Sequence, residues 1–170
     1  MPHNCEISFN TGFSVAAHMP SPHSPRSARG KSTKIDDKDS TQQTLKILVA
    51  EDDNISRLFL SRVLSKFGHS VTSVKSGKEV LKALQTADVF DVLLTDIQMP
   101  EIDGMELTQI VRSDSRYRAH ACLPIIAMTA YTSTGDREKY LTAGMDEYLP
   151  KPIDGKLLAI MLENFSVKQS

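Results

Sequence analysis

The stretch Asp91-Val92-Leu93-Leu94-Thr95-Asp96 places a short apolar run directly before a carboxylate. Similar apolar runs recur from Leu45 onward, and longer segments with helical spacing separate them. This alternation predicts βα units arranged around a parallel sheet. The stretch at 91–96 is then the third strand of the sheet, and Asp96 lies where that strand ends.

The segments on either side of this strand continue the pattern. Further strands are expected over Lys46–Ala50, Ser70–Val74, Pro124–Met128 and Glu147–Leu149. A first helix should carry apolar residues at intervals of three and four, namely Ile55, Leu58, Phe59, Val63 and Leu64. Other helices are expected over 78–85, 105–111 and 136–143, and after a cap at Asp154. Because the connections between parallel strands are right-handed, few topologies are compatible with this alternating order. The doubly wound sheet is the one we predict.

The chain divides into a tail and one domain. Residues 1–44 are rich in Ser, Pro, Thr and charge, and they lack sustained apolar periodicity. Such a segment cannot bury enough apolar surface to offset the entropy lost on ordering, so we predict a disordered tail or linker. The domain is expected over 45–165, followed by a short tail at 166–170. A chain of 170 residues fits one hydrophobic core with such tails.

Composition argues against several classes of function. The formal net charge is -1 and the hydrophobic share is 40%, so we expect no nucleic acid contact from this chain. Every apolar run is shorter than the roughly 20 residues that span a bilayer, and the N-terminus has no basic region followed by an apolar stretch. We therefore predict a cytoplasmic protein without a membrane segment.

Polar residues gather where the predicted strands end. Strand one is followed by Glu51-Asp52-Asp53, strand three ends in Asp96, strand four ends in Thr129, and strand five is followed by Lys151. In a parallel sheet these ends share one edge, where ligands bind. Because neighbouring strands are about 4.8 Å apart, carboxylates from strands one and three can share a cation. Magnesium suits this edge, since it prefers oxygen ligands from one or two carboxylates and a phosphate.

The same residues have the chemistry for phosphoryl transfer. Clustered carboxylates repel one another, and a magnesium ion together with the Lys151 ammonium would oppose that repulsion. An ionised Asp96 could then attack a phosphorus atom. Lys151 would stabilise charge on the transferring oxygens, and Thr129 would donate a hydrogen bond to one of them.

Four segments, in the right order, resemble the receiver domains of two-component response regulators and hybrid histidine kinases. They are Ile47-Leu48-Val49-Ala50-Glu51-Asp52, then Leu93-Leu94-Thr95-Asp96-Ile97-Gln98-Met99-Pro100 with Asp103-Gly104, then Ile126-Ala127-Met128-Thr129-Ala130, and Gly144-Met145-Asp146-Glu147-Tyr148-Leu149-Pro150-Lys151-Pro152. The resemblance covers about Leu45 to Phe165. It implies a flavodoxin-like α/β fold, a five-stranded parallel sheet in the order 2-1-3-4-5 with five helices.

The resemblance also implies roles for the acidic residues. Asp96 would be the phosphorylated residue. Asp52 and Asp96 would bind Mg2+ together with the backbone carbonyl of Gln98. Glu51 would orient a water bound to that metal. The implied cofactor is therefore Mg2+.

Three residues at the ends of strands four and five complete the implied site. Thr129 and Lys151 would contact the phosphoryl group, and a cis peptide is implied at Lys151-Pro152. Thr129 and Tyr148 would form a switch that alters partner binding on phosphorylation; a core-packing role for Tyr148 is an equal alternative. Phosphorylation and dephosphorylation of its own aspartate would be the only catalysis of such a domain.

The resemblance implies a place in a phosphorelay. A histidine kinase or a histidine phosphotransfer protein would supply the phosphoryl group from a phosphohistidine. The receiver would be a monomer or a weak, phosphorylation-dependent dimer. Since five βα units fill the chain almost to Ser170, we expect no output domain after them. The phosphorylated surface would then act on a partner, or the chain would be the C-terminal piece of a hybrid histidine kinase, which the segment at 144–152 favours.

Three alternatives remain beside this interpretation. Asp53 stands where hybrid-kinase receivers often carry Asn, so Asp52 and Asp53 could be the acidic pair in place of Glu51 and Asp52. An aspartate-dependent phosphatase would require a second Asp at position 98, where Gln98 stands. A binding module that works without phosphorylation could keep the fold and lose the chemistry. The acidic, hydroxyl and amine positions that the chain keeps argue against this last alternative.

Overall fold

The computed structural model describes residues 43–86, 88–130 and 134–166. The predicted tails at 1–44 and 166–170 therefore lie almost entirely outside the described residues. The described residues belong to one compact unit, Gln42–Ser170.

The sheet has five parallel strands in the order β2-β1-β3-β4-β5. The strands are β1 (Lys46–Ala50), β2 (Ser70–Val74), β3 (Val92–Asp96), β4 (Ile125–Thr129) and β5 (Glu147–Pro150). The predicted fold class and strand order are confirmed. The central strands β1 and β3 form because their apolar runs can be buried on both faces.

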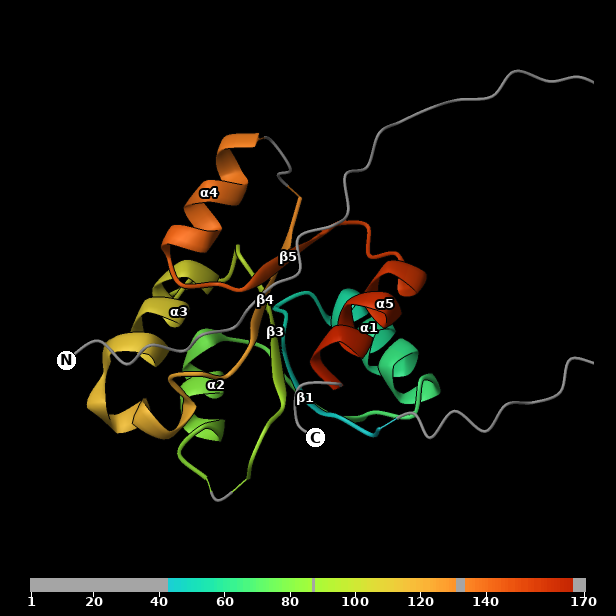
Figure 1. Cartoon of the computed structure of the whole chain (residues 1–170), viewed down its shortest axis with the longest axis horizontal. Helices are drawn as coiled ribbons and strands as arrows, with labels where there is room; N and C mark the ends of the chain where they lie inside the picture. The colour runs from blue at the N-terminus through green and yellow to red at the C-terminus, as the bar shows by residue number, and fades with distance from the viewer. Residues whose placement is uncertain (1–42, 87, 131–133, 167–170) are drawn as a thin grey trace, which may run out of the picture. The chain divides into compact units, whose positions relative to one another are not determined.

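Helices cover both faces of the sheet (Figure 1). They are α1 (Asn54–Lys66), α2 (Gly77–Ala83), α3 (Gly104–Ser113), α4 (Thr134–Thr142) and α5 (Gly155–Ser166). One face carries α1 and α5, and the other carries α2, α3 and α4. Successive residues of a strand point to opposite faces, so Ile47 packs in the core under α1 and α5, and Leu48 in the core on the other side. Two hydrophobic cores therefore hold the sheet in place.

One helical element was not predicted from the sequence. A 3-10 helix, η1, spans Ser115–His120 between α3 and β4. Its sequence, Ser-Arg-Tyr-Arg-Ala-His, has one large apolar residue and hence no periodicity to indicate a helix. That residue, Tyr117, is 2% exposed, and its hydroxyl accepts a hydrogen bond from Gln85 at 3.0 Å. η1 therefore closes the core beneath α2 and α3.

α1 is delimited by its caps. The Asp53 side chain accepts a hydrogen bond from the Ser56 amide at 2.7 Å, which fixes the first turn. At the other end Gly68 has a φ of 84° and its amide bonds to the Ser65 carbonyl, so the helix ends there as the glycine predicts.

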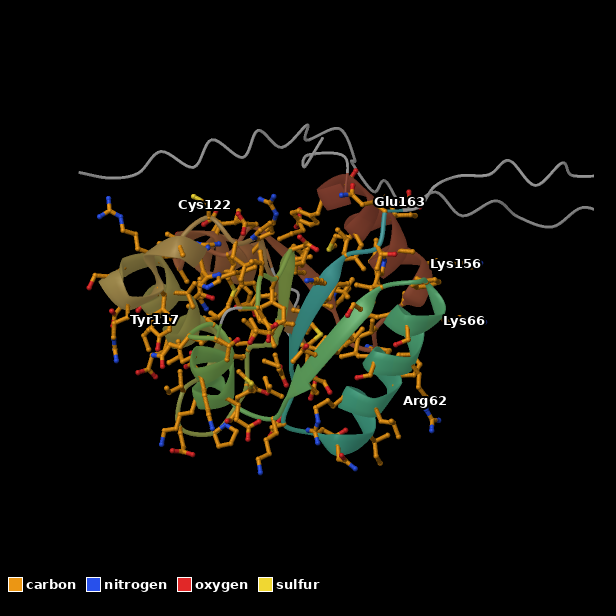
Figure 2. The ribbon with its side chains drawn as sticks, turned by 90° about the horizontal axis from the view of Figure 1, so that it is seen from below. Arg62, Lys66, Tyr117, Cys122, Lys156 and Glu163 are labelled. Atoms are coloured by element: carbon orange, nitrogen blue, oxygen red, sulfur yellow. The ribbon has the colours of Figure 1, made fainter. Side chains whose placement is uncertain are left out.

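The outer surfaces of α1 and α5 are polar in part. Figure 2 shows Arg62 and Lys66 on the side of α1 that faces away from the sheet, and Lys156 and Glu163 on the outside of α5. Within the described ranges, every helix is too short or too polar to cross a membrane.

Candidate functional site

The candidate site lies at the carboxyl edge of the sheet. Asp96 is the last residue of β3, and Thr129 is the last residue of β4. Glu51 directly follows β1, and Lys151 directly follows β5. Strand register brings these ends together, because Ala50 pairs with Thr95 and Thr129 pairs with Pro150. The topology thus brings together residues that lie up to 100 positions apart in the sequence.

Lys151 bridges two carboxylates of this edge. Its Nζ atom donates hydrogen bonds to Glu51 Oε2 at 2.8 Å and to Asp96 Oδ2 at 2.7 Å. Its backbone amide donates to the Thr129 carbonyl at 2.8 Å, which holds the end of β5 against the end of β4. The Lys151-Pro152 peptide is cis, as the resemblance implies.

The acidic cluster has the composition of a site for a hard cation. Glu51, Asp52 and Asp96 each place a carboxylate oxygen within 4.8 Å of the others. Glu51 is 1% exposed and Asp96 is 6% exposed, whereas Asp52 faces solvent. Two buried carboxylates with one exposed neighbour are ligands that suit Mg2+, which keeps several waters of its own. The residues present therefore fit the predicted cofactor.

The charges of the cluster interact strongly. Burial raises the pKa of Glu51, and the negative charge of Asp96 adds to this effect, while the hydrogen bond from Lys151 opposes it. Burial also opposes the charge on Lys151, but its hydrogen bonds to Asp96 and Glu51 outweigh burial and raise the pKa of Lys151. The ammonium and a bound cation would therefore stabilise the same two carboxylates.

Asp53 has a different environment from its two acidic neighbours. Its carboxylate caps α1, and the hydrogen bonds from Ser56 lower the pKa of Asp53 below its ordinary value. The group of carboxylates that lie within ligand distance of one another contains Glu51 and Asp52 but not Asp53, among the described residues. The structure thus brings together the pair preferred from the sequence. Their proposed roles remain predictions.

The loop after β3 packs tightly on Asp96. The Gln98 amide donates to Asp96 Oδ1 at 3.2 Å, which orients the carboxylate; the predicted metal contact of the Gln98 carbonyl remains a prediction. A Cβ atom at Gly104 would clash with the Asp96 carbonyl oxygen. Only glycine permits this approach of α3 to the end of β3, so Gly104 helps to position Asp96.

Thr129 contacts a residue that the sequence did not single out. Its Oγ1 atom lies 2.9 Å from the hydroxyl of Tyr140 on α4, and both side chains are buried. The Tyr140 ring in turn lies 6.4 Å from the ring of Tyr148 on β5, measured between centroids. The sequence places Tyr140 on a helix between Thr129 and Tyr148, but it gives no sign of a hydroxyl that reaches Thr129.

A groove with apolar walls opens beside the charged residues. It measures about 320 Å³ and is lined by residues of α1 and of the segment after β5: Glu51, Ile55, Ser56, Phe59, Leu60, Lys151, Pro152 and Ile153. Ile55 is 79% exposed and Phe59 is 48% exposed. Because Glu51 and Lys151 line both the groove and the acidic cluster, the two features are continuous.

Comparison with known families and proteins gives a consistent result. Residues 47–163 match the family model described as response regulator receiver domain. Hybrid signal transduction histidine kinase I of Dictyostelium discoideum is 39% identical over 118 residues. That match covers 66% of this chain and 7% of the kinase, so the chain spans a small part of its relative's length.

Two solved structures are similar to the described domain. The receiver domain of sensor histidine kinase PA1611 from Pseudomonas aeruginosa, with a magnesium ion coordinated in its active site cleft, is 32% identical with a TM-score of 0.63. The match covers 72% of this chain and 98% of that one. The receiver domain of Ssk1 from Saccharomyces cerevisiae, solved with the histidine phosphotransfer protein Ypd1, is 26% identical with a TM-score of 0.63. This match covers 68% of this chain and 84% of the matched chain.

Proposed function

This chain belongs to the response regulator receiver domains, and we propose that it accepts a phosphoryl group from a phosphohistidine onto Asp96. The observation that carries the proposal is the environment of Asp96. Its carboxylate is 6% exposed, within hydrogen-bond distance of Lys151 and within 4.8 Å of two further acidic residues. Phosphoryl transfer requires a nucleophilic carboxylate beside positive charge. Here the Lys151 ammonium supplies that charge, and the acidic cluster offers a site for a metal ion.

Atoms and electrons balance in the proposed transfer. An oxygen of the Asp96 carboxylate forms a bond to phosphorus as the P–N bond of the phosphohistidine breaks, and the bonding electron pair returns to the imidazole nitrogen. Lys151 remains charged and stabilises the transferred oxygens, and the Thr129 hydroxyl donates to one of them. Each of these residues comes from the end of a different strand, so the rigid sheet fixes their relative positions.

We assign the cofactor site to the acidic cluster. Asp52 and Asp96 would hold Mg2+ with the Gln98 carbonyl, and Glu51 would orient a metal-bound water. When bound, the ion supplies positive charge that offsets the repulsion between the carboxylates and the incoming phosphoryl group. The magnesium ion in the PA1611 receiver supports this assignment for a protein 32% identical to this chain.

The groove beside the site is the surface that we assign to the phosphoryl donor. Glu51 of the acidic cluster and Lys151, which contacts that cluster, line this groove, and the exposed side chains of Ile55 and Phe59 lie along it. The complex of Ypd1 with the Ssk1 receiver makes a histidine phosphotransfer protein the favoured partner. The similarity to a hybrid kinase makes a larger kinase the favoured context of this domain.

A labelling experiment tests the proposal. With Mg2+ and acetyl phosphate, the protein should gain the mass of a phosphoryl group at Asp96, and Asp96→Asn should abolish the gain. Asp91→Asn is the matched control, because Asp91 precedes the opposite end of the same strand, where it accepts a hydrogen bond from the Lys46 amide that Asn can also accept. Full labelling of Asp96→Asn would contradict the proposal. Failure of the unsubstituted protein to be labelled would favour a binding module that works without phosphorylation.

A further inference from the structure

Tyr140 links the candidate site to α4 through a hydrogen bond to Thr129. The Tyr140 hydroxyl and Thr129 Oγ1 are 2.9 Å apart, and the two residues are 5% and 1% exposed. The Thr129 backbone is held on the other side, since its carbonyl accepts from the Lys151 amide. The Thr129 backbone is therefore held at the start of the segment after β5, and its side chain is held by the helix that carries Tyr140.

The number of protons on each hydroxyl limits how these groups can pair. A threonine hydroxyl has one proton to donate and two lone pairs that accept. A phenol is more acidic than an alkyl hydroxyl, so it is the stronger donor of the two. When Tyr140 donates to Thr129 Oγ1, the Thr129 hydroxyl donates its own proton to an acceptor other than Tyr140.

We propose that Tyr140 is a positioning residue for phosphoryl transfer: its phenol donates to Thr129 Oγ1 and directs the Thr129 proton toward a phosphoryl oxygen on Asp96. This inference rests on the proposed function. A phosphoryl oxygen is an anionic acceptor, so the Thr129 bond to it is charge-assisted. Hydrogen bonds in a chain polarise one another, and the contact from Tyr140 therefore strengthens the bond that Thr129 makes. Tyr140 itself does not touch the transferred group.

The same contact gives a route from the site to the predicted switch. The rings of Tyr140 and Tyr148 are tilted by 44° with centroids 6.4 Å apart, a separation at which aromatic pairs attract. If Thr129 moves toward a phosphoryl oxygen, its hydrogen bond pulls the Tyr140 hydroxyl in the same direction. The Tyr140 ring then shifts relative to the Tyr148 ring. Tyr140 thereby connects the two residues, Thr129 and Tyr148, that were predicted to move together.

Removal of a single hydroxyl tests the inference. Tyr140→Phe keeps the ring, and we expect it to slow the labelling of Asp96 by acetyl phosphate about three- to tenfold, as for the loss of one hydrogen bond to a residue that contacts the phosphoryl group. In a Thr129→Ala background the same substitution should cause no further slowing, because its effect passes through the Thr129 hydroxyl. Tyr117→Phe is the matched control: it removes another buried phenol hydroxyl with one observed hydrogen bond, and labelling should keep its rate.

Several results would overturn the inference. A Tyr140→Phe protein that is labelled at the parent rate contradicts it while leaving the proposed function intact. If Tyr140→Phe slows labelling equally in the parent and in the Thr129→Ala background, Tyr140 affects labelling through the stability of the fold and not through Thr129. If the parent protein is not labelled, both the proposed phosphorylation of Asp96 and the proposed role of Tyr140 are contradicted. If Tyr140→Phe does not fold, NMR of the parent decides: Mg2+ with beryllofluoride should shift the amide resonance and the aromatic ring resonances of Tyr140, and unmoved resonances contradict the inference.

Discussion

Three consecutive carboxylates, at positions 51 to 53, have three different environments. Glu51 is buried and accepts from Lys151, Asp52 faces solvent beside the cluster, and Asp53 caps α1. Side chains that follow one another at the end of an extended strand point in different directions, which separates neighbours of like charge. This geometry favours Glu51 and Asp52 as the acidic pair over Asp52 and Asp53.

Paired alanine substitutions distinguish the two assignments. Asp52→Ala should weaken Mg2+ binding by at least about tenfold, because it removes a ligand from the cluster. Asp53→Ala should change Mg2+ affinity only modestly and should lower the melting temperature by a few degrees, because α1 loses its cap. Calorimetric titration with MgCl2 and thermal unfolding measure the two effects. The opposite ranking in the titration would show that the acidic pair is shifted by one residue.

α1 shows what periodicity can predict about an element. The spacing of its apolar residues predicted a helix, and Asn54–Lys66 confirms it. Only Leu60 and Leu64 are buried, whereas Ile55, Leu58 and Phe59 are 79%, 50% and 48% exposed. Which part of an apolar face remains open depends on how neighbouring elements pack, and spacing alone does not contain that information. Exposed apolar side chains beside a charged pocket are typical of a binding surface.

The exposed face of α1 should be needed for transfer from a protein donor. Phe59→Ser should slow phosphoryl transfer from phosphorylated Ypd1, used as a histidine phosphotransfer protein, about tenfold or more, because it removes an aromatic contact from the groove. Labelling by acetyl phosphate, which needs no docking surface, should change little. The matched control is Val89→Ser: Val89 is 65% exposed and lies before β3, at the edge of the sheet opposite the site. Equal slowing by both variants, or by neither, would contradict the assigned surface.

At the scale of the whole molecule, the sequence predicts the features that the sheet itself determines. The strand ends share an edge, so the convergence of Glu51, Asp96 and Lys151 could be expected before any coordinates. The strands at Lys46–Ala50 and Ser70–Val74 have the predicted bounds. Contacts made by side chains across layers could not be expected, because they depend on helix placement to within about an ångström. The hydrogen bond of Tyr140 to Thr129 is such a contact.

A second contact of this kind stabilises the domain away from the site. Arg112 on α3 donates to Asp146 Oδ2 at 2.9 Å, and the same oxygen accepts from the Ile125 amide at the start of β4. Burial lowers the pKa of Arg112, although the charge of Asp146 opposes that shift. Sequence spacing gave no reason to pair two residues 34 positions apart. The pair joins α3, β4 and β5, so its role is best explained as structural.

His69 gives the folded state a dependence on pH. It is 7% exposed and directly precedes β2, and its Nδ1 atom accepts a hydrogen bond from the Leu45 amide at 3.3 Å. A protonated Nδ1 could not accept that bond. Burial lowers the pKa of His69 below its ordinary value. The unfolded chain therefore binds this proton more readily, so the contribution of His69 to stability is complete above about pH 6.5 and decreases as the pH falls below it.

Urea unfolding at pH 7, 6 and 5 measures this contribution. His69→Asn keeps an acceptor for the Leu45 amide and does not titrate, so its free energy of unfolding should fall less than that of the parent between pH 7 and pH 5. Both proteins have the same carboxylates, so the contribution of the carboxylates to the pH dependence cancels when the two free energies of unfolding are compared. If His69→Asn and the parent lose stability in parallel, the buried imidazole does not set the acid sensitivity of this domain.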